Sequence, residues 1–292
     1  MNLLPELDDT ALADGCLYVV GMPIGNLKDI TLRALDTLKE VDLILAEDTR
    51  NTLHLLAHYD INTPLEAFHE HNEAQKTAKM VERLQNGKAM ALVSDAGTPC
   101  ISDPGYRLIA AAVAAGVCVV PIPGASAAIT AMSVSGMPSD GFVFVGFLPR
   151  KGGKQKTVLE RLASYRETLI FYESPKRVRD MLLSIQEVLG DRPAILAREV
   201  TKIYEEMLRG TVSEIITKLD MRDVVKGECT VIVAGNSGAA TEITDALINE
   251  IEEALIANES VSQIAKRLAV ETKVSKKKIY ECALDMKNEM ER

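Results

Sequence analysis

Ser94-Asp-Ala-Gly-Thr-Pro-Cys-Ile-Ser-Asp-Pro-Gly105 is a polar, turn-forming stretch that separates the apolar run 88–93 from the helical pattern 106–115. Two glycines, two prolines and two aspartates follow an expected strand and precede an expected helix. At this position an α/β protein exposes backbone amides to a ligand. Loops of this composition occur in any α/β fold, so an ordinary strand-to-helix turn is an equally good interpretation of this loop alone. We interpret it as the floor of a cofactor site because other loops point the same way.

Two further loops of small residues follow the expected strands 16–20 and 117–122. They are Gly21-Met-Pro-Ile-Gly-Asn26 and Pro123-Gly-Ala-Ser-Ala-Ala128. Small residues let the amino terminus of a helix approach a ligand closely. The carboxyl ends of parallel strands meet at one edge of a sheet, so the three loops predict a single crevice. The first loop has the spacing G-x-x-x-G, and the sequence has no G-x-x-x-x-G-K-[ST] motif, so a nucleotide phosphate is not the expected ligand.

A cluster of charged side chains follows the expected strand 41–46. Glu47, Asp48 and Arg50 lie at the carboxyl end of that strand, where α/β proteins place functional groups. We therefore predict a functional role for this cluster. In the alternative interpretation, Asp48 or Thr49 only caps the helix that follows.

The composition indicates a soluble globular protein with room for two domains, since 47% of its 292 residues are hydrophobic. The net charge of −9 argues against a protein that coats nucleic acid, so any such contact must come from local basic patches. Five cysteines lie far apart with no C-x-x-C, which is typical of reduced thiols in a cytoplasmic protein without a zinc site. Neither a leader peptide nor an apolar run that could span a membrane is indicated.

One segment of this acidic chain is strongly basic. Residues 150–179 contain nine basic and three acidic residues, which leaves a local charge of +6. The segment starts within a glycine-containing stretch, 148–156, that we interpret as a flexible loop and as the hinge between two domains. This concentration of charge predicts an anionic partner, and the alternative is a solvated face beside a mobile loop.

The second half of the chain predicts a different kind of sheet. The runs 193–198 and 202–209 are joined closely enough to form an antiparallel pair, which indicates a second α/β domain with a mixed sheet. The predicted parts of the chain are a flexible tail over 1–15, an amino-terminal α/β domain over 16–148, a carboxyl-terminal α/β domain over 149–238 and a helical extension over 239–292.

The helical extension contains two segments, 260–269 and 274–280, with the pattern of a helix-turn-helix. Its lysine-rich turn would suit contact with nucleic acid. A plain amphipathic packing appendage is an equally good interpretation, since acidic residues outnumber basic ones eleven to eight from Thr241 to Arg292.

Six ordered motifs together resemble the tetrapyrrole-methylase-like family. They are Leu17–Thr31, Ala46–Arg50, Ser94–Gly105, Pro123–Ala127, Phe171–Pro175 and Arg198–Lys202. The resemblance covers about residues 16–235 and implies a two-domain α/β fold of class III methyltransferases, S-adenosylmethionine as cofactor, and a homodimer. It is to the branch that methylates RNA, and implies 2′-O-methylation of a cytidine in the decoding region of 16S rRNA. Gly21–Asn26 replaces the fuller G-x-G-P-G-D turn of tetrapyrrole methylases, which disfavours a tetrapyrrole substrate.

The resemblance also implies roles for residues that match the family's motifs. The implied cofactor contacts are Pro23, Ile24, Asp95, Ala96, Gly97, Thr98, Ile101, Ser126, Ala127, Tyr172, Glu173 and Val200. A ribose hydroxyl attacks a methyl group only when a base takes its proton, and the candidates for that base are Asp48, Glu47 and Glu173, in that order. RNA phosphates are expected to contact basic side chains, namely Arg50, Arg150, Lys151, Lys154 and Lys156.

Two other functions remain open at this point. One is a methylase of the same fold that acts on a small molecule such as a tetrapyrrole, or on a protein side chain. The basic segment 150–156 and the lysine-rich extension count against it. The other is a non-catalytic RNA-binding or assembly protein that uses an inherited fold.

Overall fold

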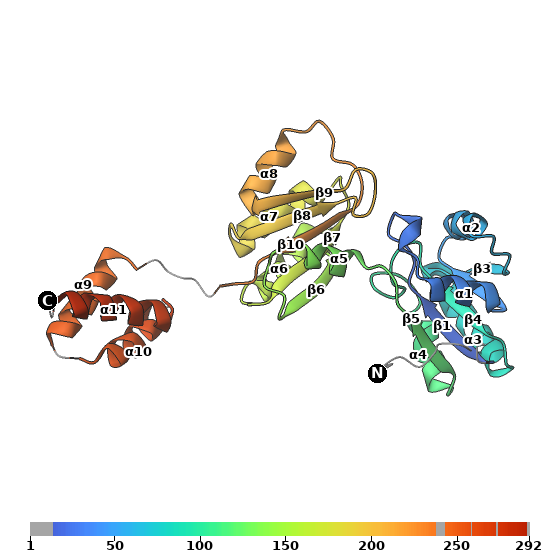
Figure 1. Cartoon of the computed structure of the whole chain (residues 1–292), viewed down its shortest axis with the longest axis horizontal. Helices are drawn as coiled ribbons and strands as arrows, with labels where there is room; N and C mark the ends of the chain where they lie inside the picture. Colours follow the sequence, from blue (N-terminus) through green and yellow to red (C-terminus); the bar gives the residue numbers. More distant parts are fainter. Residues whose placement is uncertain (1–13, 238–242, 258, 273, 291–292) are drawn as a thin grey trace, which may run out of the picture.

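The computed structural model describes residues 14–237, 243–257, 259–272 and 274–290. Figure 1 shows that they form two domains built on sheets and a separate cluster of helices. The predicted flexible tail falls on residues 1–15, of which 1–13 lie outside the described residues, as does the predicted start of the extension at residue 239.

The first domain is built on a parallel sheet with the strand order β3-β2-β4-β1-β5. Hydrophobic runs bounded by polar turns predict its longer strands, and β3, with only three residues, is too short for that signal. The strands are β1 (Cys16–Val20), β2 (Leu43–Ala46), β3 (Leu65–Ala67), β4 (Met90–Val93) and β5 (Cys118–Ile122). The connecting helices are α1 (Leu32–Glu40), α2 (Thr49–His58), α3 (Glu70–Gln85) and α4 (Tyr106–Ala114), after the 3-10 turn η1 (Leu27–Asp29).

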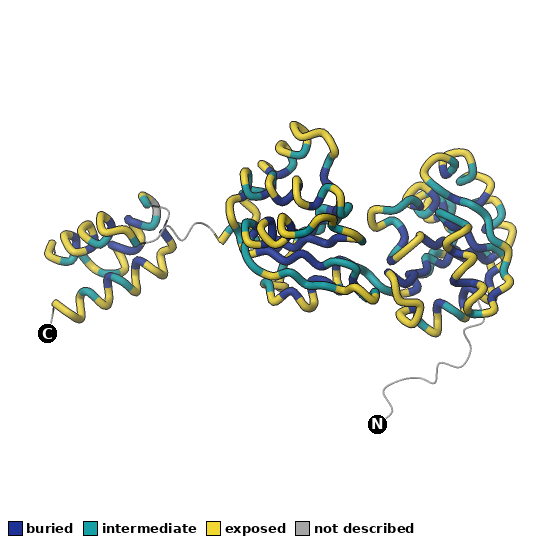
Figure 2. The backbone as a smooth tube through the Cα atoms, turned by 90° about the horizontal axis from the view of Figure 1, so that it is seen from above, coloured by how far each residue is buried: buried dark blue, intermediate teal, exposed yellow. Residues whose placement is uncertain are grey.

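Side chains alternate between the two faces of this sheet, which explains its three layers. On one face Tyr18 packs in a core with Leu38 of α1, and on the other Leu17 packs in a core with Met80 of α3 and Leu108 of α4. Burial of each large apolar side chain contributes roughly 1.5–3 kcal/mol. Figure 2 shows the buried strands between more exposed helices.

The second domain contains a mixed sheet with the strand order β6-β7-β10-β8-β9. Its first two strands are parallel, whereas β10 runs antiparallel to both β7 and β8, and β9 runs antiparallel to β8. The predicted antiparallel pair and the α/β class are therefore confirmed. The elements are β6 (Phe142–Phe147), α6 (Gly152–Leu162), β7 (Thr168–Glu173), α7 (Val178–Leu189), β8 (Pro193–Arg198), β9 (Glu206–Thr211), α8 (Val212–Asp220) and β10 (Cys229–Val233).

The structure differs from our expectation at the start of this domain. We expected residues up to 148 in the first domain, but β6 pairs with β7 and belongs to the second sheet. The predicted flexible loop over 148–156 is wrong, because helix α6 begins at Gly152. Leu159 and Leu162 of α6 are buried in the core that the helices form on one face of the second sheet. That burial holds the helix in place. The first turn of the helix does not reveal it, because its glycines and lysines are typical of a loop.

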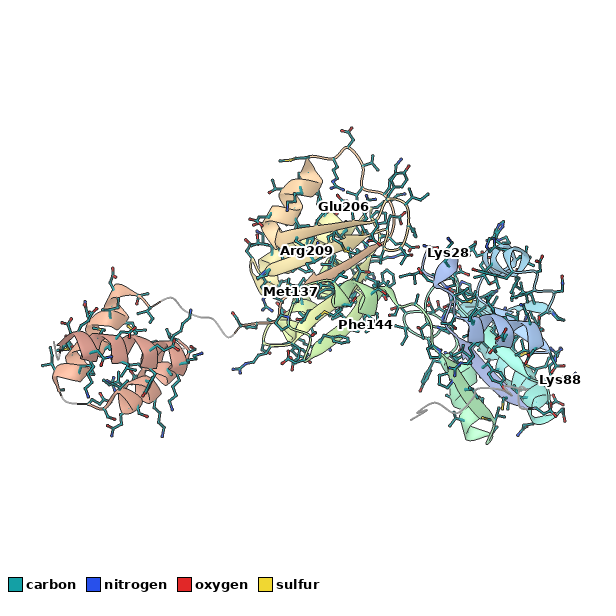
Figure 3. The ribbon with its side chains drawn as sticks, in the orientation of Figure 1. Lys28, Lys88, Met137, Phe144, Glu206 and Arg209 are labelled. Atoms are coloured by element: carbon teal, nitrogen blue, oxygen red, sulfur yellow. The ribbon has the colours of Figure 1, made fainter. Side chains whose placement is uncertain are left out.

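The opposite face of the second sheet is covered by α5 (Ala127–Ser133) and by a residue of the first domain, Ile24. Phe144 and Met137, labelled in Figure 3, pack against this core. The guanidinium of Arg209, in β9, donates to the carbonyl of Val134 at the end of α5, at 2.7 Å. The polypeptide thus passes from one domain to the other through a packed helix.

The carboxyl-terminal cluster contains α9 (Asp245–Ile256), α10 (Val261–Thr272) and α11 (Lys276–Met290). Ile251, Ile264, Leu268 and Ile279 are fully buried in a core of their own. The predicted helix-turn-helix segments fall on α10 and α11, which pack against each other and against α9, whereas residue 273 between them lies outside the described residues. Among the helices of the described ranges, none combines the length and the apolar character needed to cross a membrane.

Candidate functional site: a cavity between the two domains

The loops after β1, β4 and β5 are joined by backbone hydrogen bonds. Met22 and Gly97 form an isolated antiparallel bridge, in which the Met22 amide donates to the Gly97 carbonyl at 2.8 Å and the Gly97 amide donates back at 3.1 Å. Gly97 has φ 72°, a left-handed conformation that glycine adopts without strain. The hydroxyl of Thr98 donates to the carbonyl of Ala125, at 3.4 Å. The predicted meeting of these three loops at one edge is what the structure shows.

Two glycines let the first and third of these loops touch. A Cβ atom added to Gly124 would lie 2.6 Å from the carbonyl oxygen of Gly21, and one added to Gly21 would lie 2.7 Å from the Cα of Gly124. The Gly21 amide also donates to Ile122, at 3.0 Å. These glycines therefore serve close packing of two backbones.

The second domain closes the site from the other side. The Tyr172 hydroxyl accepts a hydrogen bond from the amide of Ala128, at 3.1 Å, and so ties β7 to α5. Burial raises the pKa of Tyr172 above its usual value, so its hydroxyl stays neutral at physiological pH. The ring of Tyr172 makes edge-to-face contacts with Phe144 and Phe147, whose centroids lie 5.0 Å and 5.7 Å away.

Between these parts lies a cavity of about 340 Å³. Its walls combine apolar side chains with a few hydroxyl and carboxylate groups, which is typical of a small-molecule site. The lining residues are Ile24, Ala96, Gly97, Thr98, Ile101, Ser102, Asp103, Ser126, Ala127, Phe147, Tyr172, Glu173, Ser174, Pro175, Val200, Glu228, Cys229 and Thr230.

The structure brings the predicted cofactor contacts together at this cavity, except for Pro23 and Asp95. Pro23 is buried beside it. Asp95 instead holds the start of α2, because its carboxylate accepts from the Asp48 amide and from the Asn51 side chain, both at 3.0 Å.

Sequence reasoning missed several lining residues. Ser102 and Asp103 lie in the 94–105 loop itself, so the sequence placed them near the site. It did not show which residues of that loop line the cavity. The others come from the ends of strands in the second sheet: Phe147, Ser174, Pro175, Glu228, Cys229 and Thr230. The start of β10 reaches the cavity because β10 is antiparallel to β7, which pairs Cys229 with Glu173.

The candidate base Asp48 does not line the cavity. Its carboxylate accepts from the Arg50 guanidinium at 2.5 Å and from the Arg50 amide at 2.9 Å, and so caps α2. These hydrogen bonds lower the pKa of Asp48 to about 2, which keeps it ionised and makes it a weak base. Arg50 itself has an 85% exposed side chain.

The other two candidate bases differ from each other. Glu47 also lies outside the lining, and burial, assisted by the charge of Asp95, raises its pKa. Glu173 lines the cavity and is buried, but one carboxylate oxygen accepts from the amide of Ser174 at 2.7 Å. Its other oxygen lies 3.0 Å from the guanidinium of Arg177 but accepts no hydrogen bond within the described residues. Glu173 is thus held by hydrogen bonding at one oxygen and by the charge of Arg177 at the other.

Asp103 is a further carboxylate at this site. It is half-buried and lines the cavity. Burial raises its pKa to about 7, assisted by the negative charges of Glu47 and Asp95, while the hydroxyl of Ser94 works in the opposite direction. A carboxyl with such a pKa exchanges protons near neutral pH, which is a property of functional sites.

Strained backbone surrounds the cavity. Cys100 and Ser102 have φ angles of 69° and 73°, and Glu199 and Thr201, on either side of the lining residue Val200, have 52° and 69°. Each such residue costs about 1–3 kcal/mol, and persists only where its surroundings hold it. Strain of this kind is concentrated at binding sites.

The predicted RNA contacts lie outside the cavity. Arg150 and Lys151 precede α6 and Lys154 lies in its first turn. All three are exposed, and none of their side chains has an ion pair or hydrogen bond within the described residues. Lys156 differs, because its ammonium lies 2.9 Å from the carboxylate of Glu187 on α7. Other basic side chains of residues 150–179 also form ion pairs within the domain, as Arg177 does with Glu173.

Comparison with known proteins agrees with the fold. The family model for Tetrapyrrole (Corrin/Porphyrin) Methylases matches residues 16–216, and the chain therefore belongs to this family of S-adenosylmethionine-dependent methyltransferases. Among curated proteins, it is 46% identical over 270 residues to the ribosomal RNA small subunit methyltransferase I of Streptococcus pyogenes serotype M1, a match that covers 91% of this chain and 94% of the relative. The protein of the same name from Bacillus subtilis (strain 168) is 42% identical over 273 residues, with 91% and 93% covered.

Solved structures share the fold at low sequence identity. The uroporphyrin-III-C-methyltransferase from Thermus thermophilus has 20% identity and a TM-score of 0.53, covering 75% of this chain and 94% of that one. The methyltransferase CobJ has 19% identity and a TM-score of 0.57, with 78% and 96% covered. These similarities confirm the predicted two-domain methylase fold.

The cavity fits S-adenosylmethionine. Its volume of about 340 Å³ suits a ligand of this size. Apolar walls such as Ile24 and Val200 match the adenine and the alkyl chain, and groups such as Ser126 and Glu173 offer partners for the hydroxyl and ammonium groups. A Cβ atom at Gly97 would lie 3.4 Å from Ile24, an ordinary contact, so it is the left-handed backbone with φ 72° that favours glycine in this floor.

Proposed function

We propose that this protein transfers a methyl group from S-adenosylmethionine to the ribose 2′-hydroxyl of a cytidine in the decoding region of 16S rRNA, in the cytoplasm and as a homodimer. The observation that carries the proposal is one cavity, lined by both domains, with an exposed aromatic ring and unpaired basic side chains close by in the sequence. The names of the relatives, which are 42–46% identical, support ribosomal RNA as the substrate.

Phe147 and the residues that follow it support an RNA substrate. The ring of Phe147 lines the cavity yet is 57% exposed, which is unusual for a phenylalanine. Aromatic faces next to basic side chains bind unpaired nucleotides, because bases stack on the rings while the cations attract phosphates. Phe147 is followed within a few residues by Arg150, Lys151 and Lys154. We therefore assign the stacking of an unpaired base to Phe147 and phosphate contacts to the three cations.

The residues of the cavity would act mainly by positioning. When bound, S-adenosylmethionine supplies an electrophilic methyl group on a positively charged sulfur. The buried side chains of Ile24 and Val200 exclude water from its surroundings, while Gly97, Ser126 and Ala127 let the backbone approach closely. Holding an oxygen nucleophile in line with the reacting carbon can supply about 7–11 kcal/mol of the barrier reduction. Outside the cavity, Arg50 would contact an RNA phosphate, and Asp48 would hold the Arg50 guanidinium.

Methyl transfer with a tritiated donor tests the proposal. The purified protein is given small ribosomal subunits, naked 16S rRNA or a tetrapyrrole, and the product is digested to locate the label. We expect label on the 2′-oxygen of one cytidine of the decoding region, with transfer to the subunit or its RNA alone. Label on a base, on a ribosomal protein or on the tetrapyrrole would contradict the proposal. Light scattering of the pure protein tests the homodimer.

A further inference from the structure

One carboxylate of the 94–105 loop, that of Asp103, lines the cavity and interacts electrostatically with Glu47 and Asp95. Asp103 lines the cavity directly after Ser102, whose left-handed backbone turns the chain at this point. The bulged strand β6 packs on this turn, since a Cβ added to Gly146 would lie 3.1 Å from the Ser102 hydroxyl. Both domains therefore hold the position of Asp103.

We propose that Asp103 is the general base that takes the proton of the attacking ribose hydroxyl. This inference rests on the proposed function and names the residue that carries its proton transfer. The hydroxyl oxygen forms a bond to the methyl carbon as the carbon–sulfur bond breaks, and the electron pair of that bond stays on sulfur. The hydroxyl proton passes to a carboxylate oxygen of Asp103, so charge and atoms balance.

Asp103 suits this role better than the carboxylates that sequence reasoning favoured. A general base works best when its pKa lies near the working pH. The pKa of Asp103 is raised to about 7, whereas that of Asp48 is lowered to about 2 by its ion pair with Arg50. Glu173 has one carboxylate oxygen hydrogen-bonded to Ser174 and the other in an ion pair with Arg177, at 3.0 Å.

The groups that face Asp103 come from several elements. Glu47 follows β2 and Asp95 follows β4, and their negative charges favour the protonated form of Asp103. Burial raises the pKa values of Cys100 and Tyr172, and the charge of Asp103 adds a smaller contribution in the same direction. Glu47 is thus a residue that acts through another: its charge raises the pKa of the base, although Glu47 does not itself line the cavity.

Single-turnover methylation of small ribosomal subunits between pH 5.5 and 9 tests the inference. We expect the wild-type rate to rise with pH and to level off above about 7. Asp103→Asn should lower the plateau rate by roughly 10²–10⁴-fold and abolish the rise, since it removes the base. Calorimetry should show that this variant still binds S-adenosylmethionine, with a loss of affinity far smaller than the loss of rate.

Glu47→Gln should move the midpoint of the pH–rate profile to lower pH. Asp140→Asn, which changes an exposed aspartate, is the matched control.

A second measurement needs neither RNA nor methyl donor. Nuclear magnetic resonance of protein with carboxyl-labelled aspartate should show one group that titrates near pH 7, absent in Asp103→Asn and shifted to lower pH in Glu47→Gln. Asp103→Asn with the wild-type rate and pH profile would overturn the inference alone and leave the proposed function intact. Failure of the wild-type protein to methylate the subunit would overturn both.

Discussion

At the scale of single residues, the site depends on positions where the side chain is absent or the backbone is strained. Gly21 and Gly124 bring two loop backbones into contact, and Gly97 adopts a left-handed conformation in the floor of the cavity. Ser102 adopts a backbone conformation that costs about 1–3 kcal/mol, and turns the chain just before Asp103. Such positions are sensitive to the addition of a single methyl group.

We predict that Gly124→Ala destabilises the protein by roughly 1–3 kcal/mol and weakens binding of S-adenosylmethionine, because the new Cβ would lie 2.6 Å from the Gly21 carbonyl oxygen. Denaturant unfolding and calorimetry measure the two effects. Gly153→Ala, in helix α6, is the control, since nothing lies within 4 Å of its added Cβ. It should leave stability unchanged or raise it slightly. Equal stability of the two variants would show that the loops can separate at little cost.

At the scale of elements, charged side chains hold the rim of the cavity on the second domain. Glu206, at the start of β9, accepts from Arg222 at 2.6 Å and 2.8 Å and from Arg198 of β8 at 3.0 Å. Lys202 lies nearby, with its ammonium 2.9 Å from Glu199 and 3.1 Å from Glu228, which lines the cavity. These contacts join β8, β9 and the segment that leads into β10.

We predict that the stabilisation from Glu206 depends on pH. Its arginine partners lower its pKa to about 2, so the folded state binds this proton less tightly than the unfolded state, whose glutamates titrate near about 4.3. The stabilisation is therefore complete above about pH 5 and disappears as the pH falls towards 2. Glu206→Gln should cost roughly 1–3 kcal/mol at pH 7, and this difference should shrink in acid. Urea unfolding at several pH values measures it.

The control for this prediction is Glu82→Gln, which changes an exposed carboxylate on α3. It should change the free energy of unfolding little at any pH. If Glu206→Gln lost the same stability at pH 3 as at pH 7, the ion pairs would not be its cause.

At the scale of the whole molecule, an acidic protein carries a local group of exposed basic side chains. The net charge is −9, yet Arg150, Lys151 and Lys154 are exposed and unpaired within the described residues, just after the lining residue Phe147. Figure 3 shows Lys28, from the loop after β1, on the side of the first domain that faces the second, whereas Lys88 lies at the far end. Lys28 thus lies on the side of the first domain where the cavity is, and Arg150, Lys151 and Lys154 follow the cavity residue Phe147 in the sequence.

We predict that the variant Arg150→Glu/Lys154→Glu binds small-subunit RNA more weakly and with a shallower dependence on salt. Each lost phosphate contact should reduce the slope of log K against log salt by roughly 0.7–0.9. Affinity for S-adenosylmethionine should be unchanged, which filter binding and calorimetry together measure. Lys39→Glu, at the last turn of α1, is the control. A parallel loss of affinity for RNA and for the cofactor would indicate damage to the fold.

The sequence by itself determined the parallel first sheet and the joining of its loops. Apolar runs whose side chains alternate across two faces form strands, and glycine, proline and aspartate end them. Both signals depend on a few neighbouring residues, so they can be read from the sequence. It also indicated the antiparallel β8–β9 pair. The amino-terminal helical turn of α6 escaped it, since its glycines and lysines resemble a loop and only the burial of Leu159 and Leu162 supports the helix.

Only the tertiary structure decided what surrounds each reactive group. The raised pKa of Asp103 depends on its burial and on the charge of Glu47, which comes from the end of another strand, with a smaller effect from Asp95 of its own loop. The entry of Cys229 and Thr230 into the cavity depends on the antiparallel direction of β10. In the same way, Asp48, which sequence reasoning placed first among the bases, is engaged by Arg50. Charge and burial act through space, so a pattern of neighbours along the chain does not reveal them.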